Sequence, residues 1–194
     1  MNNVTRGSGV FEGFLAKKRA EKADSMIPSS YRKGRVLDVG CGSYPYFLIN
    51  TEFKEKYGLD PSLSKLKIEN LKLKKMDVTK NKLPFKNDFF DTVTMLAVFE
   101  HIDNEKLIFV LKECRRVLKN GGVLIITTPS SWSDKLLHRM ALVGLISSEE
   151  IHEHKTHHSK ATIEEIIDKS GFKKDNLISG YFEFGFNMWF AANK

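Results

Sequence analysis

Short runs of apolar residues alternate along this chain with longer segments in which apolar residues recur every three or four positions. Continuous runs rich in β-branched residues are typical of buried strands, and the wider spacing is typical of helices with one apolar face. The predicted strands span residues 36–39, 56–59, 74–78, 91–96 and 123–127. The predicted helices span residues 9–26, 45–53, 104–118 and 162–169. Residues 120–122, Asn-Gly-Gly, are expected to cap the third of these helices, because glycine commonly follows a helix end.

The last part of the chain follows another pattern. Residues 177–191 are rich in aromatic residues and are interrupted by Gly180 and Gly185, which predicts two strands with no helix between them. Strands that alternate with helices form parallel sheets covered on both faces. The sequence therefore predicts a doubly wound α/β fold, with a mostly parallel seven-stranded sheet, helices on both faces and an antiparallel C-terminal hairpin strand. We expect residues 1–194 to form one domain.

The segment between the fifth strand and the last helix carries more apolar side chains than an exposed loop normally has. These side chains are Trp132, Leu136, Leu137, Met140, Leu142, Val143, Leu145 and Ile146. One interpretation is a helix packed on the sheet. A second is a lid-like insertion, over about residues 130–158, that excludes water and favours a partly apolar substrate. A third, a membrane-surface helix, is less favoured because the stretch is short and has few lysines.

Composition and charge narrow the function classes. The chain has 194 residues, 41% of them apolar and 28% charged, as is ordinary for a globular protein. The net charge of +7 indicates either a lysine-rich solvated surface or a nucleic-acid or membrane partner. The densest lysine cluster, residues 65–75, alternates with leucines rather than aromatic residues, which favours the solvated surface.

Other features bear on the cellular compartment. The two cysteines, Cys41 and Cys114, provide no disulfide framework, so a reducing cytoplasm is the simpler expectation. The first residues lack the apolar core of a signal peptide. No apolar run approaches the roughly 20 residues of a membrane-spanning helix. We therefore expect a cytoplasmic protein without a membrane span, and the oligomeric state stays open.

A glycine turn is the strongest candidate for chemistry. The apolar run 36–39 contains Asp38 and leads into Gly40-Cys41-Gly42, and Asp60 ends the next apolar run twenty residues after Gly40. Glycines let backbone N–H groups approach a ligand, and an acid at the end of the second strand suits the ribose of a nucleotide. A dinucleotide site of the dehydrogenase type is disfavoured, because Pro45 stands where its third glycine belongs.

These residues resemble the class I S-adenosylmethionine-dependent methyltransferases, and in particular their type 11 group. The motifs that carry the resemblance are Val36-Leu37-Asp38-Val39-Gly40-Cys41-Gly42, Leu83-Pro84-Phe85 before Phe90-Asp91, Ala97-Val98-Phe99-Glu100-His101 and Leu118-Lys119-Asn120-Gly121-Gly122. The likeness covers roughly residues 31–191. It implies S-adenosylmethionine as the cofactor. The family often has a glycine in place of Tyr44, so the resemblance implies a less open loop here.

The resemblance also assigns roles to single residues. Asp38 would organise the amino end of the cofactor, Asp60 would accept its ribose hydroxyls, and Asp77 would accept its adenine amino group. Leu96 and Ala97 would lie under the methionyl part. The full set of expected cofactor-binding residues is Asp38, Gly40, Cys41, Gly42, Asp60, Pro61, Asp77, Val78, Leu96 and Ala97.

Histidines are the candidate catalytic residues. His101 follows the fourth strand, and His152, His154, His157 and His158 cluster before the late helix. His101, His152, His154 and His157 are candidates for the general base of a substrate hydroxyl, and the alternative is that they are solvated or structural histidines. A metal is not expected. Some related methyltransferases have a Glu-x-x-Glu-His run here, and this chain has Ala97 in place of its first glutamate.

The resemblance leaves the methyl acceptor open. The amino-methylating nucleic-acid enzymes have an Asn/Asp-Pro-Pro-aromatic run after strand four, where this chain has residues 96–100, Leu-Ala-Val-Phe-Glu. This difference favours an oxygen or carbon nucleophile on a small molecule, with nucleic acid a less favoured partner. The alternatives are an RNA methyltransferase, suggested by the positive charge, and a non-catalytic S-adenosylmethionine-binding protein, if Tyr44 prevents productive geometry.

Overall fold

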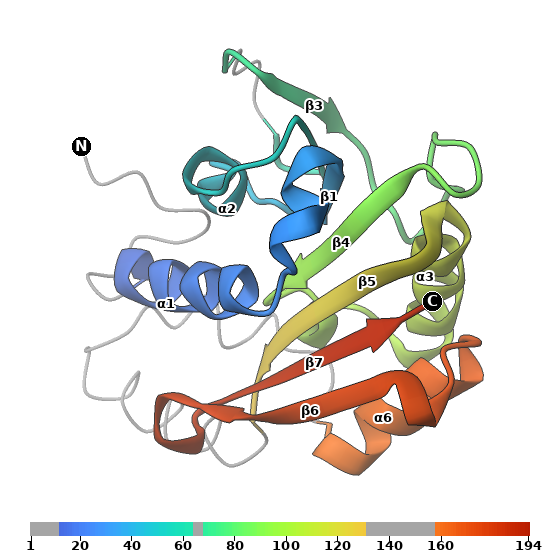
Figure 1. Cartoon of the computed structure of the whole chain (residues 1–194). Helices are drawn as coiled ribbons and strands as arrows, with labels where there is room; N and C mark the ends of the chain where they lie inside the picture. The colour runs from blue at the N-terminus through green and yellow to red at the C-terminus, as the bar shows by residue number, and fades with distance from the viewer. Residues whose placement is uncertain (1–11, 64–67, 131–157) are drawn as a thin grey trace.

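A computed structural model of the chain describes residues 12–63, 68–130 and 158–194 (Figure 1). Its strands form one seven-stranded sheet in the order β3-β2-β1-β4-β5-β7-β6. The strands are β1 (Arg35–Val39), β2 (Glu55–Asp60), β3 (Leu71–Lys75), β4 (Phe90–Leu96), β5 (Leu118–Pro129), β6 (Leu177–Phe182) and β7 (Asn187–Asn193). The first five run parallel, and β7 is antiparallel to both β5 and β6. The predicted fold is therefore confirmed, including its C-terminal hairpin.

Helices lie on both faces of this sheet (Figure 1). The α-helices are α1 (Glu12–Ser25), α2 (Tyr46–Asn50), α3 (Asn104–Val117) and α6 (Lys160–Lys169). Short 3₁₀ turns are η1 (Ser29–Lys33), η2 (Phe99–His101), η3 (Lys174–Asn176) and η4 (Glu183–Gly185). Helix α1 lies within the predicted range 9–26, of which residues 9–11 fall outside the described residues.

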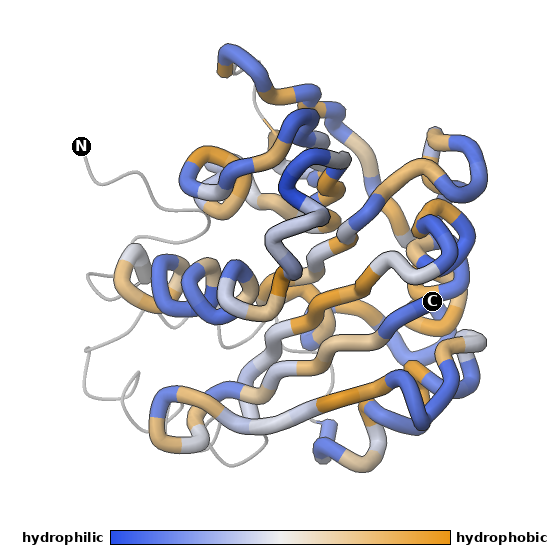
Figure 2. Tube along the Cα trace, in the orientation of Figure 1, coloured by the Kyte–Doolittle hydropathy of each residue, from blue (hydrophilic) through white to orange (hydrophobic). Residues whose placement is uncertain are grey.

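Alternating side chains of the strands build two apolar cores. Val36 of β1 and Ile125 of β5 pack with α1 and α2, whereas the adjacent Leu37 and Ile126 pack with α3 and α6. Successive residues of a strand point to opposite faces, so a run without polar residues serves both layers. Figure 2 shows the resulting concentration of apolar residues along the central strands. No helix among the described residues has the length and apolar character needed to cross a bilayer.

Three local predictions were wrong. Strand β3 spans residues 71–75 rather than 74–78, because Leu71–Lys75 pairs in register with β2 and the chain turns after Lys75. Helix α2 ends at Asn50, earlier than the predicted residue 53. The glycines at 121 and 122 do not cap α3, whose last residue is Val117.

The glycines instead belong to the irregular start of β5. Leu118 already pairs with Phe90, and the register with β4 then shifts before Val123. Gly121 adopts a φ of 77°, in the left-handed region, which accommodates this irregularity. The lid-like insertion predicted near residues 130–158 falls almost wholly on residues 131–157, outside the described residues.

Candidate functional site

The glycine turn after β1 closes against the end of β2. Gly40 and Gly42 have φ angles of 77° and 76°, which glycine adopts at little cost. The backbone N–H groups of Gly40 and Cys41 both donate to the Leu59 carbonyl, at 2.7 and 3.2 Å. A Cβ atom on Gly40 would overlap the side chain of Val98. Gly40 is therefore required both by its conformation and by the close approach of the segment after β4.

Asp60 holds the other side of this turn. Its side chain is fully buried, and its two oxygens accept hydrogen bonds from the backbone N–H groups of Gly42, at 2.9 Å, and Ser62, at 2.7 Å. An ionised carboxylate accepts hydrogen bonds and donates none, as binding of ribose hydroxyls requires. Pro61 beside it is exposed. The role of Asp60 as a ribose acceptor stays a prediction, with the residue placed at the strand end as expected.

Asp38 is a buried carboxylate within β1. Its side chain is 3% exposed and accepts a hydrogen bond from the Thr94 hydroxyl of β4 at 2.7 Å. Burial raises the pKa of Asp38 to about 7, against the opposing effect of the Thr94 hydrogen bond and with a contribution from the negative charge of Asp60. A nearby cation would favour the ionised form of such a group. Thr94 was missed by the sequence reasoning, although a threonine inside a buried strand was the available signal.

Asp77 lies in a turn two residues past β3. Its Oδ1 accepts hydrogen bonds from the backbone N–H of Thr79, at 3.0 Å, and from the Thr79 hydroxyl, at 2.7 Å. The Thr79 hydroxyl and, to a lesser extent, Lys80 lower the pKa of Asp77, so it is a stable carboxylate. The turn meets β2 through a 3.1 Å hydrogen bond from Met76 N–H to the Asp60 carbonyl, and Val78 is buried. Asp77 is thus brought to the same edge as Asp60.

The end of β4 completes the arrangement. Leu96 is half-buried. Ala97 adopts a φ of 53°, a left-handed conformation that is unfavourable for any residue with a Cβ. Ala97 N–H still donates to Thr127 of β5 at 2.9 Å. This bend brings Val98 over Gly40. Backbone strain of this kind is frequent at functional sites, and here it adjoins the glycine turn.

The acid and histidine after β4 sit in η2. Glu100 is buried and accepts a 3.0 Å hydrogen bond from the Thr128 hydroxyl at the end of β5. His101 is half-buried beside it. His158 is buried against Phe99, with ring centroids 5.5 Å apart in an edge-to-face arrangement. One member of the late histidine cluster therefore lies next to the turn that holds His101.

The other three candidate histidines, His152, His154 and His157, lie outside the described residues. Among the residues that the structure does describe, no group of three or more histidine, cysteine, aspartate or glutamate side chains could hold a metal ion. The expected cofactor-binding residues all lie at or near the carboxyl ends of β1 to β4, which meet at one edge of the sheet (Figure 1). In open α/β sheets, ligands bind at that edge.

Comparisons with known proteins agree with this geometry. A model of the methyltransferase domain family matches residues 11–177. An uncharacterized protein of Methanocaldococcus jannaschii is 35% identical over 175 residues, which cover 89% of this chain and 67% of that protein.

Two solved structures share the fold. One is an S-adenosylmethionine-dependent methyltransferase of Archaeoglobus fulgidus, with a TM-score of 0.69 and 20% identity over 98% of this chain and 96% of that chain. The other comes from the complex between the Haloferax volcanii Trm112 methyltransferase activator and a candidate methyltransferase, with a TM-score of 0.67 and 18% identity over 94% of this chain and 95% of that chain.

Proposed function

This chain belongs to the methyltransferase domain family, within the class I S-adenosylmethionine-dependent enzymes, and on that basis we propose that it methylates an oxygen or carbon atom of a small, partly apolar molecule. S-adenosylmethionine is its methyl donor. The absence of an Asn/Asp-Pro-Pro-aromatic run at residues 96–100 supports an acceptor atom other than nitrogen. The two cysteines, Cys41 and Cys114, are buried and not joined by a disulfide, which supports action in the cytoplasm.

The observation that carries the proposal is the pair of buried acids at the glycine turn. S-adenosylmethionine supplies an electrophilic methyl group on a cationic sulfonium, and it also carries an ammonium. Burial makes the Asp38 carboxylate costly to ionise alone, so a cationic ligand would be favoured there. Asp60 fixes the glycine turn through Gly42, and its carboxylate is the kind of group that accepts hydrogen bonds from ribose hydroxyls. The residues present therefore fit the donor.

The chain's contribution to the reaction would be positioning and proton transfer. Ala97, with its left-handed backbone, and the turn at Gly40 would border the bound donor. A histidine, with His101 the described candidate, would take the proton from an acceptor hydroxyl. The Glu100 side chain accepts a hydrogen bond from the Thr128 hydroxyl. Because Glu100 precedes His101 in η2, this bond helps to fix the position of His101. His152, His154 and His157 remain candidates for the same role.

Calorimetry with S-adenosylmethionine and its demethylated product tests the donor site. We expect micromolar binding, roughly −8 kcal/mol. Asp60→Ala should weaken it by about 1.5–3 kcal/mol, because the ribose hydroxyls lose an acceptor. Asp88→Ala is the matched control, since Asp88 is an exposed acid that pairs with Lys194 away from the glycine turn. Equal binding by wild type and Asp60→Ala, or no binding by either, would contradict the assignment.

A second candidate function is methylation of RNA, and the charge distribution favours it. Residues 51–86 hold ten lysines against five carboxylates, so five of the seven net positive charges lie in this part of the chain. A basic surface is the electrostatic signature of a nucleic-acid-binding protein. Transfer of a labelled methyl group to total RNA, rather than to a small-metabolite extract, would establish this candidate in place of the first.

A further inference from the structure

An aromatic cluster lies at the amino end of the parallel strands, away from the glycine turn. It consists of Tyr57 in β2 with Phe85, Phe89 and Phe90 from the segment that enters β4. Phe85 and Phe89 stack with their rings 6.1 Å apart and 7° from parallel, and each meets Tyr57 edge-to-face. Phe90 is fully buried, whereas Phe85 and Phe89 are only half-buried. The cluster therefore presents aromatic rings at the surface.

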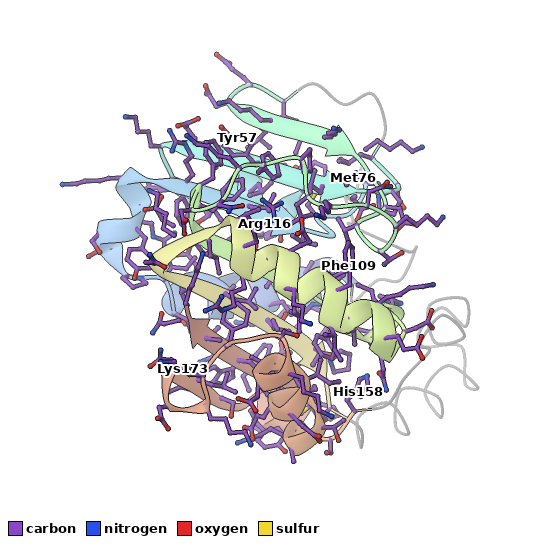
Figure 3. All side chains as sticks on the ribbon, turned by 90° about the vertical axis from the view of Figure 1, so that its right-hand side faces the viewer. Tyr57, Met76, Phe109, Arg116, His158 and Lys173 are labelled. Atoms are coloured by element: carbon purple, nitrogen blue, oxygen red, sulfur yellow. The ribbon has the colours of Figure 1, made fainter. Side chains whose placement is uncertain are left out.

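Three cations from separate segments surround these rings. The Arg35 guanidinium lies 4.4 Å from the Phe89 centroid, and the Lys86 ammonium lies 5.8 Å from it. The Lys72 ammonium lies 4.7 Å from the Tyr57 centroid. We call these six residues the cation–aromatic face: Arg35, Tyr57, Lys72, Phe85, Lys86 and Phe89. In Figure 3, Tyr57 lies on the sheet above α3 and above its Arg116.

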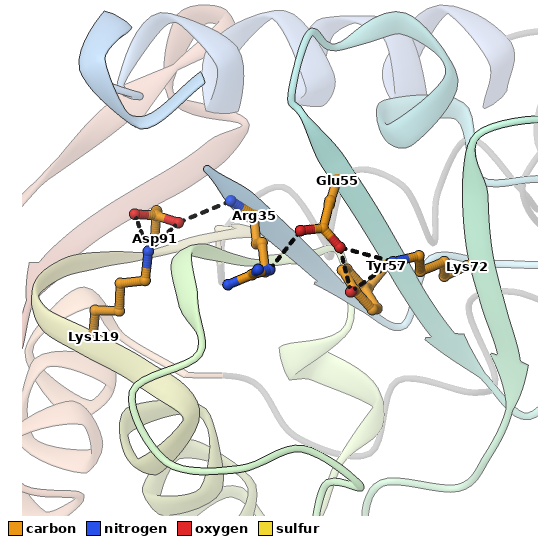
Figure 4. Close-up of polar contacts among 6 residues, drawn as sticks. All are labelled: Arg35, Glu55, Tyr57, Lys72, Asp91 and Lys119. Carbon is orange, nitrogen blue, oxygen red and sulfur yellow. Dashed lines mark hydrogen bonds and ion pairs between the residues drawn. The ribbon is translucent and has the colours of Figure 1, made fainter. Parts of the chain in front are cut away.

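Ion pairs order this face without neutralising it (Figure 4). Glu55 bridges Arg35 and Lys72, each at 2.7 Å, and also accepts a hydrogen bond from the Tyr57 hydroxyl. Lys72, together with Tyr57 and Arg35, lowers the pKa of Glu55 to about 2, so this bridge stays charged. One carboxylate thus serves two cations.

Two lysines, Lys86 of this face and Lys74 beside it on β3, add unbalanced positive charge. Lys74 shares the strand face of Lys72, two positions along β3, and Lys86 is exposed. Neither has an ion pair with any carboxylate in the described part of the chain. The cation–aromatic face therefore carries an excess of positive charge next to half-exposed rings.

From this combination we infer that the cation–aromatic face binds single-stranded RNA. Phosphates would contact the lysines and Arg35, while bases would stack against the half-exposed rings of Phe85 and Phe89. Charge complementarity alone would also suit an acidic protein, but such a partner would leave the rings unused. Arg35 is the first residue of β1, whereas the glycine turn follows the last residue of β1, so this part of the face lies at the opposite end of the strand from that turn. The face would dock RNA for the second candidate function, methylation of RNA, and would not contribute to binding of the methyl donor.

Fluorescence anisotropy with a labelled uridine-rich RNA of about 12 nucleotides provides the test. Lys74→Glu/Lys86→Glu changes two exposed lysines that have no ion pair in the described part of the chain, so folding should be preserved, and a thermal melt checks this. We expect its affinity near physiological salt to fall roughly tenfold or more, and the slope of log K against log salt to flatten by about 1.4. The control Lys173→Glu/Lys174→Glu alters net charge equally on exposed residues beside η3 and should change affinity by less than about twofold.

A third variant tests the rings. Phe89→Leu keeps an apolar side chain and should weaken binding about fivefold without changing the salt slope. Absence of RNA binding by the wild type, or equal losses in the two lysine pairs, would overturn the inference. Competition by polyglutamate as strong as by RNA would overturn it in favour of an acidic protein. Calorimetry with the demethylated product should be unchanged in all variants, so failure here is distinguishable from failure of the donor site.

Discussion

Replacing Asp38 by asparagine should remove this carboxyl group's contribution to the loss of stability between pH 5 and pH 8 in the ligand-free protein. Asp38 is buried, and burial raises its pKa to about 7, from an ordinary value of 3.8. The folded protein therefore holds a proton on this group at pH values where the unfolded chain has lost it. The resulting stabilisation is fully present below pH ~4 and is lost as the pH rises through about 7.

The size of this effect follows from the pKa difference. With a folded pKa of about 7 and an unfolded pKa near 3.9, linkage gives a loss of about 2.5 kcal/mol in the free energy of unfolding between pH 5 and pH 8. The side chain of asparagine cannot ionise, so the loss should be absent in Asp38→Asn. The Thr94 hydroxyl, which donates to Asp38, can donate equally to the asparagine carbonyl, so the fold should be retained.

Urea titrations at several pH values, without ligand, measure this directly. The quantity compared is the difference between wild type and Asp38→Asn, since other groups titrate equally in both proteins. Thr94→Val is the matched variant: it keeps the shape of Thr94 and removes the hydroxyl that favours the ionised carboxylate, so it should raise the pKa of Asp38 further and extend the loss of stability to higher pH. The reasoning is refuted if wild type and Asp38→Asn lose stability in parallel from pH 5 to pH 8.

Three further predictions concern the same edge of the sheet. Gly40→Ala should lower the free energy of unfolding by about 2 kcal/mol or more in urea titrations, because Gly40 has a φ of 77° and the added Cβ would overlap Val98. Adding Val98→Ala to this variant should restore part of the lost free energy. Ala97→Gly should raise that free energy by up to about 1 kcal/mol, because it relieves a φ of 53°, and an unchanged or lower value would argue against strain there. His101→Gln should lower turnover with little change in cofactor affinity, and wild-type methyl transfer should fall below pH ~6.5, where an imidazole is protonated; sensitivity to chelators would instead indicate a metal.

The sequence predicted the strands best where apolar runs are buried on both faces, as in β1, β4 and β5. It misplaced β3, whose Leu-Lys alternation over residues 71–75 is the period-two pattern of an edge strand. The predicted range, 74–78, took in only the last two residues of this strand. The terminal hairpin was predictable because two aromatic runs stood without a helix between them.

In the candidate site, the sequence predicted the positions of residues but not the contacts between them. The positions of Asp38 and Asp60 at strand ends follow from the spacing of apolar runs. The Thr94 hydrogen bond and the Val98 contact with Gly40 join residues more than fifty positions apart, so no local pattern reports them. They depend on β1 and β4 being neighbours in the sheet.

The same limit applies to the charge pattern. Along the sequence the lysines alternate with leucines, and this favoured a solvated surface over a nucleic-acid partner. In the sheet, the parallel register sets Arg35 beside Glu55 and Tyr57 beside Lys72, and the turn before β4 adds Phe89 to the same place. Residues spread over more than fifty positions thus form one surface in which cations and rings interleave. Such a surface cannot be predicted from local sequence. In a parallel sheet, residues at similar distances from the starts of their strands lie side by side, however far apart they are in the chain.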